Sequence, residues 1–317
     1  MHHTHTILGS LVADAASLGL HWLYSAERIA QIEAARGLVF LSPQAEDYAD
    51  VPAYFAHGQK ASGDATGYGE VCLLMARHLA QHGEFKRVEY QTEYRQLFGP
   101  GGAFVGYVDT ATRQTLLALM PLEPVAFPAA SGCADIQLPA LAALPALVAA
   151  HDGDLPALLS KVEMVVRISN HNDLSVAAGQ CAAAALFAVL QGKNISAALH
   201  ESLAVAGNTL RPLLEQTLAL PSLDSVAAAQ RFGLACDLTQ GLPVIFHIAQ
   251  HARDYRNAVE ANIRAGGDSC GRAILLGALV AANQSLQNKT EVIPLTWLAR
   301  YKQLKLAAVA CEQLAAR

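Results

Sequence analysis

The sequence has few aromatic residues, few charged residues and no block of basic side chains. Of its 317 residues, 6% are aromatic and 15% are charged, and the formal charge is −5. Nucleic-acid binding needs clustered Lys and Arg, so this composition argues against a DNA- or RNA-binding protein. The apolar share of 53%, much of it Ala and Leu, is typical of closely packed helices and argues against disorder.

The sequence also lacks a C-x-x-C pair and a long apolar run, and its opening residues predict no signal peptide. The six scattered cysteines therefore argue against a zinc knuckle, and they fit reduced, buried thiols in a cytosolic protein. The longest uncharged runs, 138–150 and 174–191, are too short or too interrupted to predict a membrane span. We expect a cytoplasmic protein that binds neither nucleic acid nor a membrane. Its oligomeric state is not indicated.

Apolar residues recur at i, i+3 and i+4 through most of the chain, and no stretch shows sustained period-two alternation. This pattern predicts an all-α fold, with residues 1–317 forming a single globular multi-helix domain without repeats. The first residues, which include His2, His3 and His5, are expected to fray. The predicted helices cover residues 6–22, 27–35, 70–81, 85–97, 110–119, 138–150, 154–168, 173–191, 195–206, 208–219, 223–233, 240–250, 253–265, 268–286 and 293–315.

The stretch 262–282 predicts a helix that begins at a carboxylate. Gly266 and Gly267 interrupt the preceding segment, and Asp268 and Ser269 then stand at an N-cap position. The run that follows is apolar on every side, which predicts a buried helix beginning within two residues of Asp268. Taken alone, such a carboxylate is more often a cap than a catalytic group.

Asp14 is the single carboxylate of an otherwise apolar first helix. A buried carboxylate needs partners, so Asp14 either bonds to a neighbouring helix end or lies in a pocket. His171, which stands among polar residues, is by itself more often a helix-capping donor than a ligand. The loop F-G-P-G-G-A-F-V-G-Y at 98–107 is not a phosphate-binding P-loop, which would require a following G-K-[ST].

The segment G-G-D-S-C-G-R-A-I-L-L-G-A-L at 266–279 resembles the motif G-G-D-[ST]-D-[ST]-x-A-x-x-x-G-A of the ADP-ribosylglycohydrolases. Other segments resemble that family in the same order along the chain. The helix that holds Asp14 resembles the family's first helix, Thr66 matches the first residue of its T-D-D-T motif, and His171 matches its histidine. The nearer resemblance is to the branch that includes the J1-crystallins and selenoprotein J.

This resemblance implies the family's all-α fold and a pocket that takes a small-molecule substrate, such as an ADP-ribose-like compound. It implies catalytic roles for Asp268, Glu70 and Asp14. The residues it implies for substrate binding are His21, Trp22, Tyr68, Gly101, Gly102, Asp135, His171, Ser269 and Arg272.

Members of the family use two magnesium ions to activate water, and this sequence departs from their ligand motifs. Gly67 and Tyr68 stand where the motif near Thr66 has aspartates, and Cys270 and Gly271 replace the last two ligands near Asp268. Magnesium prefers oxygen ligands, so the sequence argues against the binuclear site. No cofactor is expected, although a single residual Mg²⁺ site at Thr66 and Asp268 remains an open alternative. With the metals removed, we expect Arg272 to bridge to Glu70 or Asp14.

Three functions remain open from the sequence. The first is a hydrolase of an ADP-ribose-like or other glycosidic or nucleoside bond, with degenerate magnesium motifs. The second is a non-catalytic small-molecule binder on the same pocket, and the third is a crystallin-like structural protein. A pocket filled by Trp22 and Tyr68 would favour the third function.

Overall fold

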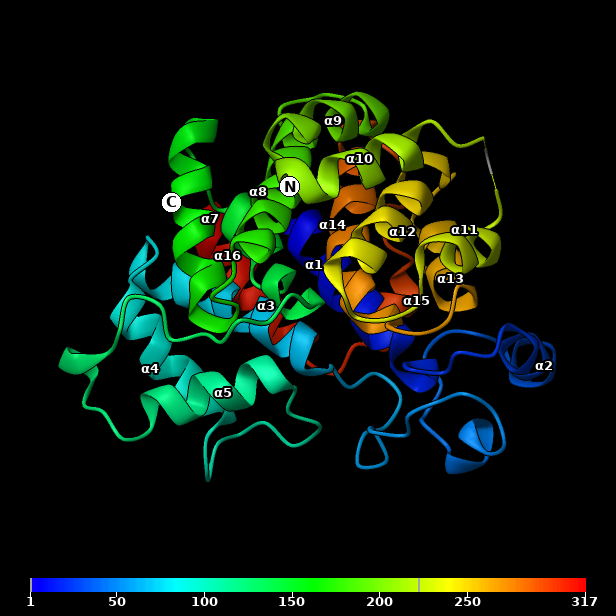
Figure 1. Ribbon diagram of the computed structural model, residues 1–317, viewed down its shortest axis with the longest axis horizontal. Helices are drawn as coiled ribbons and strands as arrows, with labels where there is room; N and C mark the ends of the chain where they lie inside the picture. Colours follow the sequence, from blue (N-terminus) through cyan, green and yellow to red (C-terminus); the bar gives the residue numbers. More distant parts are fainter. Residues whose placement is uncertain (1, 222) are drawn as a thin grey trace.

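The computed structural model describes residues 2–221 and 223–317, which fold into sixteen α-helices and five short 3-10 helices (Figure 1). In these residues extended segments meet only at isolated β-bridges, so the predicted all-α fold is confirmed. The helices are α1 (His2–Ser17), α2 (Ala26–Arg36), α3 (Gly67–His82), α4 (Arg87–Phe98), α5 (Thr110–Leu119), α6 (Leu144–Ala149), α7 (Leu155–Ser169), α8 (Asp173–Leu190), α9 (Ile195–Ser202), α10 (Gly207–Leu218), α11 (Ser225–Phe232), α12 (Leu238–His251), α13 (Tyr255–Arg264), α14 (Ser269–Leu286), α15 (Leu295–Leu298) and α16 (Leu304–Ala315).

Helices α1 and α14 form the most extensively packed pair and lie at the centre of the molecule (Figure 1). Two glycines allow their backbones to approach closely. A Cβ atom on Gly277 would lie 2.3 Å from the carbonyl oxygen of Gly9, and one on Gly9 would lie 2.5 Å from the Cβ of Ala281. The buried apolar side chains around this pair form one continuous core.

The other helices surround this central pair in two groups. In Figure 1, α3, α7, α8 and α16 lie to one side of it, and α10 to α13 lie to the other. Helix α3 packs against both α1 and α16, whereas α12 and α13 pack against α14. This arrangement brings the N-terminal ends of α3 and α14 to the C-terminal end of α1, where the sequence-predicted site residues gather.

Helix α8 is apolar enough and, at 18 residues, long enough to cross a membrane by composition alone. The sequence had suggested that this run was too interrupted for that. Here 67% of the helix is buried within the protein, against α7, α9 and α14. Its apolar surface is therefore accounted for by the core.

Two predicted boundaries are wrong for identifiable reasons. Residues 2–5 are helical rather than frayed: α1 begins at His2, and the Nδ1 atoms of His2 and His5 each lie 2.8 Å from the Ser285 hydroxyl. The predicted helix 293–315 is broken between α15 and α16. The break buries Tyr301 and lets the Lys302 amide donate to the Gly63 carbonyl at 3.0 Å, contacts that a continuous helix could not make.

Candidate functional site

Asp268 caps α14 as predicted from the sequence. Its Oδ1 accepts a hydrogen bond from the Gly271 amide at 2.8 Å, and the helix begins at the next residue. Its Oδ2 accepts one from the phenol of Tyr68 at 2.7 Å. The side chain is fully buried, and burial raises its pKa to about 6, although the Tyr68 bond and the charge of Arg272 oppose that shift. Both carboxylate oxygens are thus occupied by donors of the chain itself.

Tyr68→Phe should destabilise the protein by about 1–2 kcal/mol at pH 8, because the Asp268 carboxylate would lose a donor that water cannot replace. The loss should be smaller at pH 5, where Asp268 is mostly protonated. Urea unfolding at both pH values measures the difference. Tyr255→Phe is the matched control, since its buried phenol donates to the neutral Gly9 carbonyl. Equal pH dependence in the two variants would contradict this account.

Asp14 is bound in the same way at the start of α3. The amide of Thr66 donates to Oδ2 at 2.8 Å, and the Thr66 hydroxyl donates to Oδ1 at 2.6 Å. A Cβ atom on Gly69 would lie 2.3 Å from Oδ2, so only glycine lets α3 pack this closely. Asp14 is fully buried, and this burial raises its pKa to about 7 despite the bonds from Thr66.

His21 is neutral in this site. Its Nδ1 accepts a hydrogen bond from the Cys270 amide at 3.1 Å, which places the ring proton on Nε2. Burial, reinforced by His57 and Arg272, lowers its pKa well below the usual range. The 3.7 Å approach of Nδ1 to Asp268 Oδ1 is therefore not a charged ion pair. The buried Nε2 has no partner among the described residues.

Arg272 does not bridge to Glu70 or Asp14, and that prediction is wrong. Its guanidinium donates instead to Asn262, through Nε to the side-chain oxygen at 2.9 Å and through Nη2 to the backbone carbonyl at 3.2 Å, and also to the Gly266 carbonyl. These acceptors lie at the C-terminal end of α13 and in the turn after it. Gly266 and Gly267, both with positive φ, fold that turn onto the fully buried guanidinium. Arg272 therefore stabilises a helix C-terminus.

The remaining sequence-predicted residues lie around this centre at different distances from it. Glu70 accepts a hydrogen bond from Gln303 at 2.7 Å, and burial raises its pKa. Asp135 accepts a hydrogen bond from Asn170 at 2.9 Å, whereas His171 is exposed beside Arg167.

The last three predicted residues make no side-chain contact with the carboxylates that the structure records. The hydroxyl of Ser269 is buried without a partner in the described part of the chain. Gly101 and Gly102 lie in the turn after α4.

An aromatic cluster lies beside Asp268, which His21 and Tyr68 contact directly. Trp22 stacks on His57 with ring centroids 5.6 Å apart, and Tyr107 meets Trp22 edge-on at 5.0 Å. His21 lies 4.2 Å from the Trp22 ring and meets Tyr68 edge-on at 6.1 Å. Trp22 has φ of +61°, a strained conformation for a bulky residue, which hydrogen bonds to Gly267 and Tyr54 hold in place.

A cavity of about 300 Å³ borders this cluster. Its lining includes Phe55, His57, Lys60, Gly106 and Tyr107. His57 is only 4% exposed, and neither of its ring nitrogens has a partner in the described residues. From the sequence we singled out the glycine loop at 98–107, but we selected neither His57 nor Lys60. The unusual density of aromatic residues at 48–57 was the available signal.

A larger cavity of about 810 Å³ lies at the opposite end of α1, near His3 and Lys161. None of the sequence-predicted site residues lines it. We place the candidate site at the smaller cavity because it is lined by Tyr107 of the aromatic cluster and by the unpartnered His57, whose ring lies 5.1 Å from His21.

The residues present do not fit a pair of magnesium ions. The oxygens of Asp14 and Asp268 all accept hydrogen bonds from the chain, and the hydroxyl of Thr66 donates to Asp14. Tyr68 contributes a phenol that stays protonated, since burial and Asp268 raise its pKa far above 10. The thiol of Cys270 faces the Asp14 carbonyl at 3.6 Å and is a poor ligand for magnesium.

Known proteins resemble the chain over nearly its full length. It is 27% identical to crystallin J1A of Tripedalia cystophora over 310 residues, covering 93% of this chain and 90% of the crystallin. Crystallin J1B of the same animal is also 27% identical, with the same coverage. A solved structure titled ADP-ribosylglycohydrolase-related protein complex has a TM-score of 0.71 at 19% identity, covering 99% of this chain and 97% of that one.

That structural likeness supports the fold alone, but a family model extends the evidence to the sequence. The model described as ADP-ribosylglycohydrolase matches residues 4–317, which hold every motif that carried the resemblance. The chain therefore belongs to the ADP-ribosylglycohydrolase family.

Proposed function

We propose that this member of the family binds a small molecule without a magnesium pair and does not catalyse glycoside hydrolysis. One observation carries the proposal: Asp14 and Asp268 are fully buried, and all four of their carboxylate oxygens accept hydrogen bonds from Thr66, Tyr68 and Gly271. Neither carboxylate lines the adjoining cavity. Neither carboxylate has any exposed surface, so a water molecule would reach one only after the chain around it moved.

The cavity supports binding because its polar groups lack partners while its walls are aromatic. Burial lowers the pKa of His57 to about 4, so the ring is neutral and can donate one hydrogen bond and accept another. Lys60 supplies a positive charge, and its ammonium lies 4.6 Å from the centre of the Phe104 ring. Such a set of a few polar groups within an apolar wall is usual for a ligand site.

The expected ligand has a planar ring and an anionic group, as an ADP-ribose-like compound does. Tyr107 and Phe55 offer flat surfaces for stacking, and Lys60 would pair with the anion. At the cavity's edge, Tyr54 is 53% exposed and Val105 is 61% exposed, which leaves apolar surface available to a ligand larger than the cavity.

Two other functions are each favoured by one observation. Hydrolysis is favoured by the pKa values of Asp14 and Asp268, about 7 and about 6, which suit general acid–base catalysis near neutral pH. A structural role is favoured by relatives named crystallins and by the way Trp22 and Tyr68, each 7% exposed, fill the space beside the carboxylates.

Thermal shift with ADP-ribose, with and without Mg²⁺, tests the proposal. A ligand that binds only the folded state raises the melting temperature. We expect a shift that does not need Mg²⁺, and Lys60→Met should weaken binding about tenfold because a charged contact is lost. Lys161→Met, at the larger cavity, is the matched control and should bind normally.

Each contrary outcome identifies another function. Release of ribose products from ADP-ribosylated or nucleoside substrates would support hydrolysis. Absence of binding to ADP-ribose, nucleotides and nucleosides would support the structural role. Loss of binding in Lys161→Met alone would move the site to the larger cavity.

A further inference from the structure

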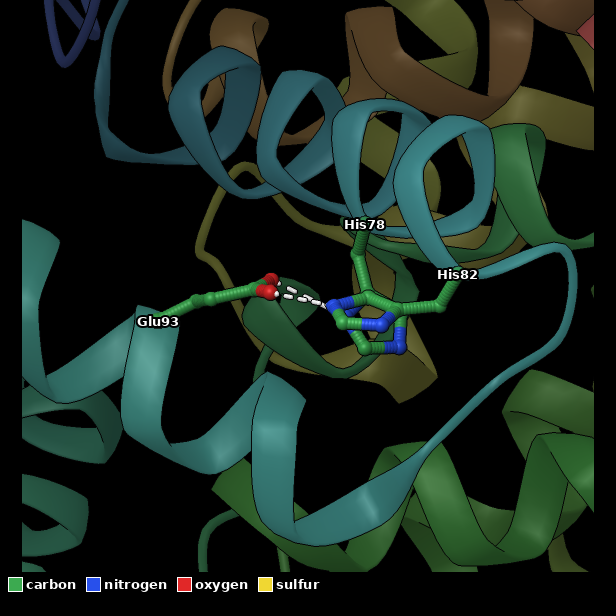
Figure 2. A group of neighbouring side chains, drawn as sticks. All are labelled: His78, His82 and Glu93. Atoms are coloured by element: carbon green, nitrogen blue, oxygen red, sulfur yellow. Dashed lines mark hydrogen bonds and ion pairs between the residues drawn. The ribbon is translucent and has the colours of Figure 1, made fainter.

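We propose that His78, His82 and Glu93 form a binding site for a divalent transition-metal ion of the Zn²⁺ class. His78 and His82 are one helical turn apart on α3, and Glu93 faces them from α4 (Figure 2). The Nδ1 of His78 lies 2.9 Å from one Glu93 oxygen, and the Nε2 of His82 lies 3.0 Å from the other. This site is separate from the proposed function, because it lies at the C-terminal end of α3.

The three donor atoms are close enough to share one ion. They all lie within 4.8 Å of one another, and each histidine nitrogen lies about 3 Å from one of the two Glu93 oxygens. Tetrahedral zinc with bonds of about 2.0–2.1 Å holds its ligand atoms about 3.4 Å apart. Only a modest adjustment of the two rings and the carboxylate is therefore needed to admit the ion. Two nitrogens and one oxygen are the donor set of catalytic and regulatory zinc sites, whereas magnesium prefers oxygen alone.

The surroundings of the cluster suit a cation. The His78 side chain is fully buried, whereas the side chains of His82 and Glu93 are 18% and 23% exposed, so an ion and a fourth water ligand can enter from that side. Phe85 and Tyr90 meet the His78 ring edge-on and hold it in place. In the described part of the chain, Glu93 accepts hydrogen bonds from these two histidines and pairs with no lysine or arginine.

Binding requires a proton to move on each histidine. On His82 the Nε2 proton, which points to Glu93, is exchanged through solvent for one on Nδ1. On His78 the change is coupled to the backbone. The Lys86 amide donates to Nε2 at 3.0 Å, so the ring proton now lies on Nδ1 and points to Glu93. A metal at Nδ1 takes the place of this proton, which moves through solvent to Nε2. The Nε2–H then faces the Lys86 N–H, and the turn at 83–86 must shift. Metal binding is thus coupled to the connection between α3 and α4.

Untagged full-length protein, stripped with EDTA, should bind one equivalent of ZnCl₂ in calorimetric titration. Co²⁺ should give visible absorption bands of tetrahedral geometry. Glu93→Gln and His82→Gln should each weaken Zn²⁺ binding by about 100-fold or more, since even the loss of a residue that supports a ligand costs 10- to 100-fold. The Lys86 amide resonance should shift on titration, as the bond to His78 is lost.

Two controls separate this site from other histidines. His251→Gln alters a second pair one helical turn apart, since His247 and His251 have ring centroids 4.7 Å apart but no carboxylate between them. His3→Gln alters the N-terminal histidines. Both should bind Zn²⁺ normally. The proposal is overturned if neither ion binds saturably, or if Glu93→Gln and His82→Gln, folded by circular dichroism, keep wild-type affinity.

Discussion

Asp14→Asn should increase the free energy of unfolding at pH 8, by an upper bound of about 4 kcal/mol, and should change it little at pH 4. The pKa of Asp14 is raised to about 7 in the folded protein, from an ordinary value of 3.8, chiefly by burial. Below pH 4 the group is protonated in both the folded and the unfolded state. Above pH 7 the folded protein holds a buried charge that the unfolded chain exposes to water.

The stability contributed by the protonated Asp14 is therefore lost as pH rises from about 4 to about 7. Asparagine stays neutral throughout, and its side chain can accept from the Thr66 amide and donate to the Thr66 hydroxyl in the same place. Urea unfolding between pH 4 and pH 8 should show a flatter profile for Asp14→Asn than for the wild type. Part of the pH dependence of stability should remain in Asp14→Asn, because Asp268 also has a raised pKa, of about 6.

Asp154→Asn is the matched control for this profile. Asp154 also accepts from a backbone amide, at the N-cap of α7, but it is exposed to water. Its substitution should leave the pH profile unchanged. A wild-type stability that rises between pH 4 and pH 7, together with a destabilised Asp14→Asn at pH 8, would show that the Thr66 bonds outweigh the cost of burying the charge.

The fold could be predicted because its signals are local. Asp268 stands directly before an apolar run and accepts from a backbone amide as predicted, and Asp109 and Asp154 cap α5 and α7 in the same way. Errors arose where tertiary contacts override the local pattern. The break between α15 and α16 is fixed by burial of Tyr301 and by a bond from Lys302 to Gly63, more than 200 residues away in sequence.

The centre of the site could be predicted in part. The family motifs brought Asp14, Thr66, Tyr68 and Asp268 together correctly, but their pairing was not visible in the sequence. Tyr68 stands where the family motif has a carboxylate, and the structure shows that its phenol satisfies the surviving Asp268. The hydrogen bond from Tyr68 thus stabilises the buried Asp268 carboxylate, a role that we had expected a positive charge to fill.

Arg272 shows why charge counting failed. We assumed that a buried carboxylate must attract the nearest cation, but the hydrogen bonds from Thr66 and Tyr68 already stabilise both aspartates. The guanidinium instead has planar donors that match the carbonyls left free at the end of α13. The turn at Gly266 and Gly267 determines which acceptors the guanidinium can reach. No sequence pattern predicts the direction of this turn.

Arg272→Ala should therefore be among the most destabilising single substitutions in the protein, at about 3–5 kcal/mol. The change removes hydrogen bonds to Asn262 and Gly266, leaves these buried carbonyls without donors, and opens a cavity in a fully buried position. It also removes the positive charge that lowers the pKa of Asp268. Arg272→Lys should cost less but should not restore stability, because an ammonium cannot reach Asn262 and Gly266 in the same planar geometry.

Guanidinium chloride unfolding at pH 7 measures these differences. Arg264→Ala is the matched control: Arg264 lies eight residues earlier at the end of α13, and its guanidinium pairs with Glu33 at the surface. Because exposed ion pairs contribute little, this control should lose less than about 1 kcal/mol. If Arg272→Ala is no less stable than Arg264→Ala, the α13 carbonyls must find other donors. The glycines, rather than the arginine, would then determine the conformation of the turn at Gly266 and Gly267.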